Sequence, residues 1–241
     1  MTEIKKILRL SRVTKTFGDI VAVHDISFDI TDGEFIFITG PSGSGKTTLL
    51  RLIMRDLLPD SGQIIIGGAD ITTMAKKDVP YLRQKIGTVF QDFKVLPERT
   101  VRENVEVALA VIGVPAGEWD ARVNQVLKLV GLLNRGHLFP AQLSGGELQR
   151  ASLARALVVN PRVILADEPT GNLDWETADS IMDLFERINQ EGKTIIMATH
   201  HQGIIDKMKK RVVGLRSGKV VSDSGKVEKV KKTKKEKPKN E

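Results

Sequence analysis

Cysteine is absent from this chain of 241 residues, and aromatic side chains make up only 5% of it. Without cysteine the chain can form no disulfide and no thiolate metal site, a composition that fits a reducing compartment. No apolar run approaches the roughly 18 residues of a membrane-spanning helix, and residues 1–6 lack the apolar segment of a signal peptide. We therefore expect a protein that stays in the cytoplasm.

A concentrated positive charge is missing from most of the chain. The formal net charge is +7, but residues 226–241 hold eight lysines and three glutamates, so the tail carries +5 and the rest +2. Binding to DNA needs a concentrated basic patch that neutralises phosphates. The near-neutral body therefore argues against nucleic acid as a partner.

The tail itself, residues 224–241, has only Val227 and Val230 as large apolar side chains. Such a segment cannot offset the entropy of ordering a chain, so we expect it to be disordered. Its lysines have two interpretations. They form either a solvated solubility tail or a polybasic segment attracted to anionic lipid.

One stretch combines an apolar strand, a glycine-rich loop and a helix start. The strand is Phe35-Ile36-Phe37-Ile38, and the loop is Gly40-Pro41-Ser42-Gly43-Ser44-Gly45-Lys46-Thr47-Thr48. Glycine allows the backbone N–H groups to turn inward, and the dipole of the following helix points at the same place. Lys46 can then reach the β- and γ-phosphates, and the Thr47 hydroxyl can ligate Mg²⁺. The motif predicts a phosphate cradle rather than an ordinary glycine-rich turn.

Several further strands end in polar residues. Apolar runs at 86–90, 163–166 and 194–198 read as buried strands, and they are followed by Gln91, by Asp167-Glu168 and by Thr199-His200-His201. Ligands of open α/β sheets bind at the carboxyl ends of the strands, so the paired carboxylates indicate chemistry there. Residues 7–13, 21–30 and 63–66 read as further strands, and 212–215 with 220–221 as a hairpin. The predicted fold class is α/β, with a mostly parallel sheet and crossover helices.

Between Gln91 and residue 160 the apolar pattern changes to a helical period. Val101, Val105, Ala108 and Ile112 share one helical face, a second stripe runs from Trp119 to Val130, and Ser144 is positioned to cap a third helix. We predict an inserted helical subdomain at about residues 92–160.

These motifs occur in the order found in ATP-binding-cassette ATPases, which the chain resembles over residues 7–223. The resemblance rests on the glycine-rich loop at residues 40–48, called the P-loop below, and on Gln91, Leu143-Ser144-Gly145-Gly146-Glu147, Asp167-Glu168 and His200. It implies one ATPase domain over residues 1–223, a P-loop NTPase whose core sheet is joined by an N-terminal antiparallel β-subdomain. Residues 90–101, together with 167–174, look like the cell-division branch of that family.

The resemblance also implies roles for single residues. Phe17 would stack on the adenine of ATP. Thr47, Gln91 and Asp167 would hold Mg²⁺, and Lys46 would bind phosphate beside it. Glu168 would act as the general base toward the attacking water, and His200 would contact the γ-phosphate. His201 is the competing histidine, one residue further from the strand end.

A homodimer on ATP binding is a further implication of the same resemblance. The nucleotide site of a second subunit would be completed by Ser144, Gly145 and Gly146. Asp174 would lie near the dimer interface. Trp175 is a departure, because family members commonly carry proline after that aspartate.

The resemblance implies an integral, FtsX-like membrane partner. The chain would then be a peripheral ATPase on the cytoplasmic face of the bacterial inner membrane, driving peptidoglycan remodelling in cell division. The alternative is the ATPase of a lipoprotein or macrolide exporter. A nucleic-acid ATPase would need a long coiled coil between Gln91 and Ser144, and a non-hydrolysing scaffold would not need Glu168 and His200. Phe93, Val95 and Leu96 are either a docking cluster for the partner or part of the core.

Overall fold

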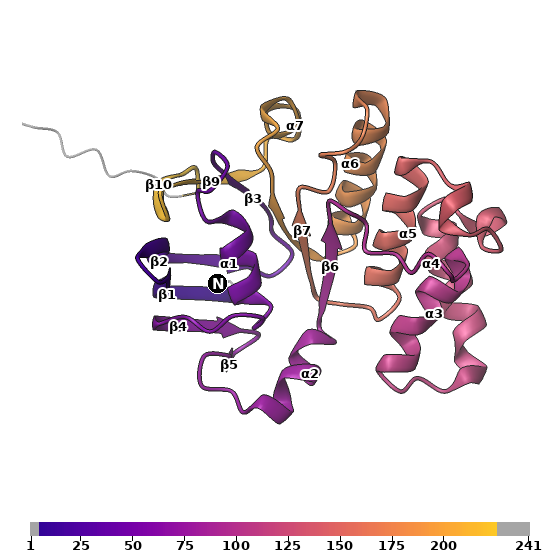
Figure 1. Ribbon diagram of the computed structural model, residues 1–241, viewed down its shortest axis with the longest axis horizontal. Coiled ribbons are helices and arrows are strands. Elements are labelled where there is room, and N and C mark those ends of the chain that lie inside the picture. Colours follow the sequence, from indigo (N-terminus) through magenta and orange to yellow (C-terminus); the bar gives the residue numbers. More distant parts are fainter. Residues whose placement is uncertain (1–4, 226–241) are drawn as a thin grey trace, which may run out of the picture.

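The computed structural model describes residues 5–225 of the chain (Figure 1). The predicted disorder of the basic tail, and its lipid contact, fall on residues outside that range except for Ser224 and Gly225. Within the described residues the chain forms two sheets with helices around them. No helix in this part of the chain combines the length and apolarity that crossing a membrane requires.

The first sheet is antiparallel and has the strand order β2-β1-β4-β5. Its strands are β1 (Lys6–Phe17), β2 (Ile20–Thr31), β4 (Ser61–Ile66) and β5 (Ala69–Asp70). Strand β1 runs four residues past the predicted end, through register shifts after Leu10, and stops at a turn where Gly18 has φ 57°. The turn leaves the Phe17 ring 44% exposed at the edge of the sheet.

The second sheet carries the P-loop and has the order β10-β9-β3-β8-β7-β6. Its strands are β3 (Phe35–Thr39), β6 (Ile86–Phe90), β7 (Val163–Asp167), β8 (Thr194–Ala198), β9 (Arg211–Arg216) and β10 (Lys219–Asp223). Strands β9, β3, β8, β7 and β6 are parallel, and β10 pairs antiparallel with β9 as the predicted hairpin. Parallel order brings the carboxyl ends of β3, β6, β7 and β8 to one edge, where the predicted polar residues come directly after them.

Helices cover the second sheet and extend beyond it. They are α1 (Lys46–Ile53), α2 (Val79–Arg83), α3 (Val101–Val111), α4 (Trp119–Leu129), α5 (Gly145–Leu157), α6 (Trp175–Gln190) and α7 (Gln202–Met208). Helices α3, α4 and α5 gather at the end of the molecule opposite the antiparallel sheet (Figure 1). They lie inside the range predicted for the helical insert.

Strand β3 divides the core, because its side chains alternate between two apolar clusters. Phe35 and Phe37 pack with residues of α3, α4, α5 and α6. Ile36 and Ile38 pack with α1 and with the antiparallel sheet. The strand that leads into the P-loop is therefore fixed on both faces.

The turn of the β9–β10 hairpin is hydrogen-bonded to the P-loop. The Gly218 N–H donates to the Ser44 carbonyl at 3.1 Å, and the His24 N–H donates to the Gly218 carbonyl at 2.7 Å. The turn at Gly218 thus joins the loop to β2. Its φ of 74° is in the region that favours glycine.

Candidate nucleotide site

The P-loop has the backbone that an anion cradle requires. Gly40, Gly43 and Gly45 have φ of 149°, 75° and 102°. A Cβ on Gly40 would collide with the Leu215 carbonyl oxygen, and one on Gly45 with the Ala22 carbonyl oxygen. Glycine is therefore required at both positions by space as well as by conformation.

The first turn of α1 faces this loop with its N–H groups free of side-chain capping. Gly45 is the N-cap and no side chain of the described residues bonds to the helix start. The Ser44 hydroxyl is buried and has no hydrogen-bond partner within residues 5–225. Unsatisfied donors at a helix N-terminus bind anions, so this end of α1 fits a phosphate group.

Lys46 lies between the loop and the carboxylate pair. Its side chain is 9% exposed, and Nζ donates to the Gly40 carbonyl at 2.8 Å and to the Pro41 carbonyl at 3.3 Å. Nζ also lies 3.8 Å from Oε1 of Glu168. The ammonium group is thus placed within reach of both the cradle and the proposed base.

A cavity of about 580 Å³ opens over the P-loop. Phe17, Ile20 and Val21 line one end, and Gln91, Glu168 and His200 line the other, with residues 41–48 between them. The structure therefore brings the predicted adenine-stacking residue and the predicted γ-phosphate residues into one space. His201 is not among the residues that line this cavity.

The ammonium group of Lys15 lies over the ring of Phe17. Nζ of Lys15 lies 5.6 Å from the ring centroid and 2.7 Å from Oδ1 of Asp60. Hydrogen bonds from Lys15 and from Thr16 lower the pKa of Asp60 to about 2. Sequence reasoning missed Lys15 and Asp60, because they come together only through the pairing of β1 with the chain before β4.

Glu168 and His200 form a polar contact where they line the cavity. Nδ1 of His200 lies 2.8 Å from Oε1 of Glu168, and the His200 N–H donates to Oε2 at 3.4 Å. Glu168 has φ 48°, an uncommon conformation for a non-glycine residue, and its N–H donates to the Ala198 carbonyl at 2.9 Å. This backbone turns the carboxylate from the end of β7 toward the loop after β8.

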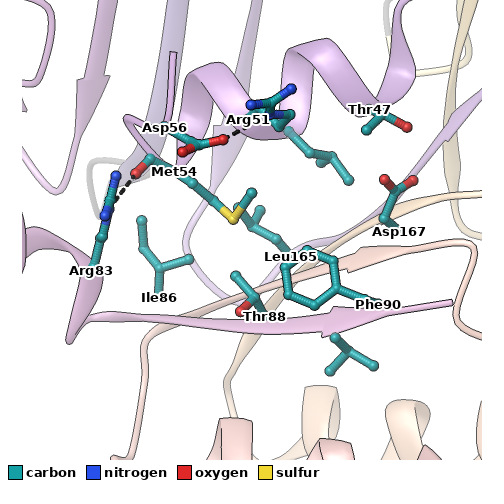
Figure 2. A pocket seen from close by; sticks show the side chains of 12 residues that line it. Thr47, Arg51, Met54, Asp56, Arg83, Ile86, Thr88, Phe90, Leu165 and Asp167 are labelled. Atoms are coloured by element: carbon teal, nitrogen blue, oxygen red, sulfur yellow. Dashed lines mark hydrogen bonds and ion pairs between the residues drawn. The ribbon is translucent and has the colours of Figure 1, made fainter. Parts of the chain in front are cut away.

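Asp167 precedes it at the end of β7 and faces α1. Burial raises the pKa of Asp167, and the nearby Thr47 hydroxyl partly opposes that rise. Oδ1 is buried without a hydrogen-bond partner in the described part of the chain. Figure 2 shows the Thr47 hydroxyl and the Asp167 carboxylate on facing sides of a gap.

Thr47 and Asp167 fit a magnesium ion only when phosphate completes its shell. Within residues 5–225 no group of three or more His, Cys, Asp or Glu could hold a metal by itself. Mg²⁺ is usually bound through one or two carboxylates together with substrate phosphates and water. A hydroxyl and an unpartnered carboxylate oxygen beside a phosphate cradle match that chemistry.

A second cavity, of about 420 Å³, begins at Thr47 and Asp167 and runs between α1 and β6 (Figure 2). Leu50, Met54 and Phe90 are among its apolar walls. Two contacts lie at its far end, between Arg51 and Asp56 at 2.7 Å and between Arg83 and the Met54 carbonyl at 3.3 Å. No pattern in the sequence indicates this space, because its walls come from separate elements.

Gln91 reaches the mouth of the nucleotide cavity but bonds elsewhere. Its Nε2 donates to Oδ1 of Asn172 at 3.0 Å, and Nδ2 of Asn172 donates to the Gln91 carbonyl at 3.1 Å. No sequence pattern singles out Asn172, although it lies between Glu168 and Asp174. Gln91 is thus held against the segment that comes after the carboxylates.

The remaining predicted residues lie apart from the P-loop cavity. Ser144 and Glu147 form a capping box at the start of α5, as the sequence indicated, and Asp174 caps α6 by accepting from Thr177. Gly146 is required because a Cβ there would collide with the Thr177 side chain. Ser144, Gly145, Gly146 and Asp174 do not line the nucleotide cavity of their own chain.

The three apolar side chains predicted either as a docking cluster or as part of the core differ in burial. Val95 packs against the core, Phe93 is half-buried, and Leu96 is 40% exposed. Phe93 and Lys94 both have positive φ, and their carbonyls accept from the Arg155 guanidinium. Of the three apolar side chains, Leu96 alone is exposed.

Known proteins share this arrangement. Residues 23–171 match the ABC transporter family. The cell division ATP-binding protein FtsE of Bacillus subtilis is 46% identical over 92% of this chain and 97% of that protein. The methionine import ATP-binding protein MetN of Geobacillus kaustophilus is 42% identical over 89% of this chain, but over only 64% of that protein.

A solved structure gives the same result in three dimensions. The dimeric structure of MJ0796, a bacterial ABC transporter cassette, matches with a TM-score of 0.81 at 37% identity and covers 90% of this chain and 97% of that one. The predicted fold class is confirmed by this match. The chain belongs to the ABC transporter family, as an ATP-hydrolysing cassette of the FtsE type.

Proposed function

We propose that the chain is the ATPase subunit of an FtsX-like membrane complex in bacterial cell division, where closure of an ATP-bound dimer drives peptidoglycan remodelling through the membrane partner. The observation that carries this proposal is the similarity to FtsE over nearly the full length of both chains. MetN is almost as similar in sequence but extends well beyond the matched region.

The proposed chemistry begins with binding of ATP. Phe17 stacks on the adenine, the P-loop amides and Lys46 hold the phosphates, and Thr47 and Asp167 hold Mg²⁺ with help from Gln91. When bound, Mg²⁺ would supply positive charge that neutralises the phosphates. The Gln91–Asn172 contact must open for Gln91 to reach that position.

Hydrolysis then depends on Glu168. Its carboxylate orients a water and accepts the proton as the water oxygen attacks the γ-phosphorus, while the bond from that phosphorus to the β–γ bridging oxygen breaks and ADP leaves. The contact with His200 holds the carboxylate at the end of β7, and His200 is placed to contact the γ-phosphate beside it. Lys46, 3.8 Å from the same carboxylate, exchanges that neighbour for phosphate.

Dimer closure gives a role to the predicted site residues that lie outside the cavity. Ser144 and Gly145 present the N-terminus of α5, and Asp174 lies at the start of α6. In a head-to-tail dimer these residues complete the nucleotide site of the second subunit. The dimeric MJ0796 structure supports dimerisation of the present chain.

The experiment is co-purification from the native bacterium followed by depletion. We expect the tagged chain to retain a four-span membrane protein with a large extracytoplasmic loop, and depletion to produce filaments that Glu168→Gln cannot rescue. Recovery of a lipoprotein or macrolide exporter instead, with normal division on depletion, would reject the division role in favour of export.

A further inference from the structure

Two side-chain contacts connect the segment that follows β7 with the segment that follows β8. The segment after β7 ends with the start of α6, and the segment after β8 leads into α7. Glu168 and His200 form the first contact between them. The second is between the rings of Trp175 and His201, whose centroids lie 5.3 Å apart at an interplanar angle of 39°.

The space for this second contact depends on a glycine. A Cβ on Gly203 would lie 3.0 Å from Cη2 of Trp175, closer than real Cβ atoms normally approach. The indole therefore lies directly over the start of α7. His201 is the N-cap of that helix, and its carbonyl accepts from the N–H groups of Ile204 and Ile205 at 3.2 and 3.3 Å.

The ring of His201 is positioned by packing more than by hydrogen bonds. Its Nδ1 is buried and has no hydrogen-bond partner within residues 5–225. The only bond of its backbone N–H among those residues is to Oγ1 of Thr199, at 3.1 Å. Removing the indole would leave the imidazole of His201 without the ring that it packs against. The next residue toward β8 in this loop is His200.

We propose that Trp175 is a positioning residue for ATP hydrolysis, which holds the loop carrying His200 in place by packing its ring against His201. This inference rests on the role proposed above for His200. Trp175 does not line the nucleotide cavity, so its effect passes through the loop. A small displacement of a group that positions a reaction can cost about a hundredfold in rate, and a loosened loop costs less.

The test compares variants of the full chain. We expect Trp175→Ala to lower kcat about tenfold while KM for ATP stays within about twofold, and Trp175→Phe to restore most of the rate because it keeps an aromatic face. His201→Ala should match Trp175→Ala, and the double variant should be no slower than either, because both remove one contact. Unchanged kcat in Trp175→Ala, or additive losses in the double variant, would overturn the proposal.

Combination with His200→Ala separates this inference from the role of His200. Trp175→Ala should cause no further loss in that background. If His200→Ala alone hydrolyses ATP normally, the role of His200 fails and the role of Trp175 fails with it. If His200→Ala is inactive and Trp175→Ala is normal, only the role of Trp175 fails.

Fluorescence and assembly give readouts besides activity. The chain has two tryptophans, so Trp119→Phe leaves Trp175 as the only one. Its emission should change on His201→Leu, because the two rings are in contact, and identical spectra would overturn the proposal. Trp175→Ala combined with Glu168→Gln should still form an ATP-bound dimer. A monomer there would make Trp175 an interface residue instead.

Discussion

Nδ1 of His200 lies 2.8 Å from the carboxylate of Glu168, and this contact joins the ends of two neighbouring parallel strands. It places the histidine beside the proposed base. The same carboxylate is 3.8 Å from Lys46, so three groups with different tasks share one small space.

Replacing Glu168 by glutamine should separate binding from chemistry. The amide keeps the size of the side chain but cannot accept the proton, so ATP turnover should fall by about a hundredfold or more. ATP should still bind, and the variant should elute as a dimer with ATP and Mg²⁺. Turnover near the wild-type rate would show that another group acts as the base.

Lys46→Ala should weaken ATP binding. The loss of a charge-assisted contact to phosphate should reduce affinity at least about tenfold in calorimetry. Lys128→Ala is the matched control, since that lysine is exposed on α4, far from the P-loop in sequence and in fold. Equal affinity of the two variants would contradict the assignment of the cradle.

Ser144→Arg should abolish turnover while each subunit still binds ATP. The bulky cation would obstruct the facing site of the dimer but leave its own cavity unchanged, because Ser144 does not line it. Mixing this variant with Lys46→Ala allows a heterodimer with one complete site. Partial recovery of ATPase activity is expected, and no recovery at any mixing ratio would count against the trans arrangement.

Asp60→Asn should lower stability in a pH-dependent way. Because the folded-state pKa of Asp60 is about 2, below the 3.8 of a free aspartate, the carboxylate stabilises the fold above pH 3.8 and loses that effect as the pH falls toward 2. The difference in urea midpoint between wild type and variant should therefore be present at pH 7 and shrink below pH 4. A difference that stays constant from pH 7 to pH 3 would disprove this linkage.

Val111→Glu should weaken attachment to the membrane partner. Val107 and Val111 are one turn apart on α3 and are 37% and 76% exposed, and Val111 borders a groove of about 440 Å³ between α3, α5 and β6. The variant should keep its ATPase rate but lose co-purification with the partner. Val221→Glu is the control, because Val221 is 62% exposed on β10 and does not line that groove. Equal retention of both variants would place the docking surface elsewhere.

Local patterns were enough to predict the P-loop and the strands that end at Gln91, Asp167 and His200. Each is a short apolar run with a distinct polar or glycine-rich end, so burial of the run fixes the position of the residues next to it. The cap at Ser144 was predictable for the same reason, since Glu147 three residues later completes a capping box.

Other parts of the site depend on contacts between distant residues. Strand β1 continues past Val13 because bulges keep it paired while the apolar alternation is lost. Gln91 meets Asn172, Lys15 meets Phe17 and Asp60, and Trp175 meets His201 only after the sheets have formed. Helix α6 begins at Trp175 without the proline that family members carry there. The Asp174 side chain caps the helix instead.

The position of β3 between β8 and β9 has a consequence for synthesis of the chain. The P-loop strand leaves the ribosome early, but its two neighbours and the Gly218 turn that bonds to Ser44 come from the last part of the described chain. At about 5–20 residues per second, a ribosome needs about 10–35 s to reach them. We therefore expect the P-loop to reach its final conformation, and the chain to bind ATP, only after the β9–β10 hairpin has been translated.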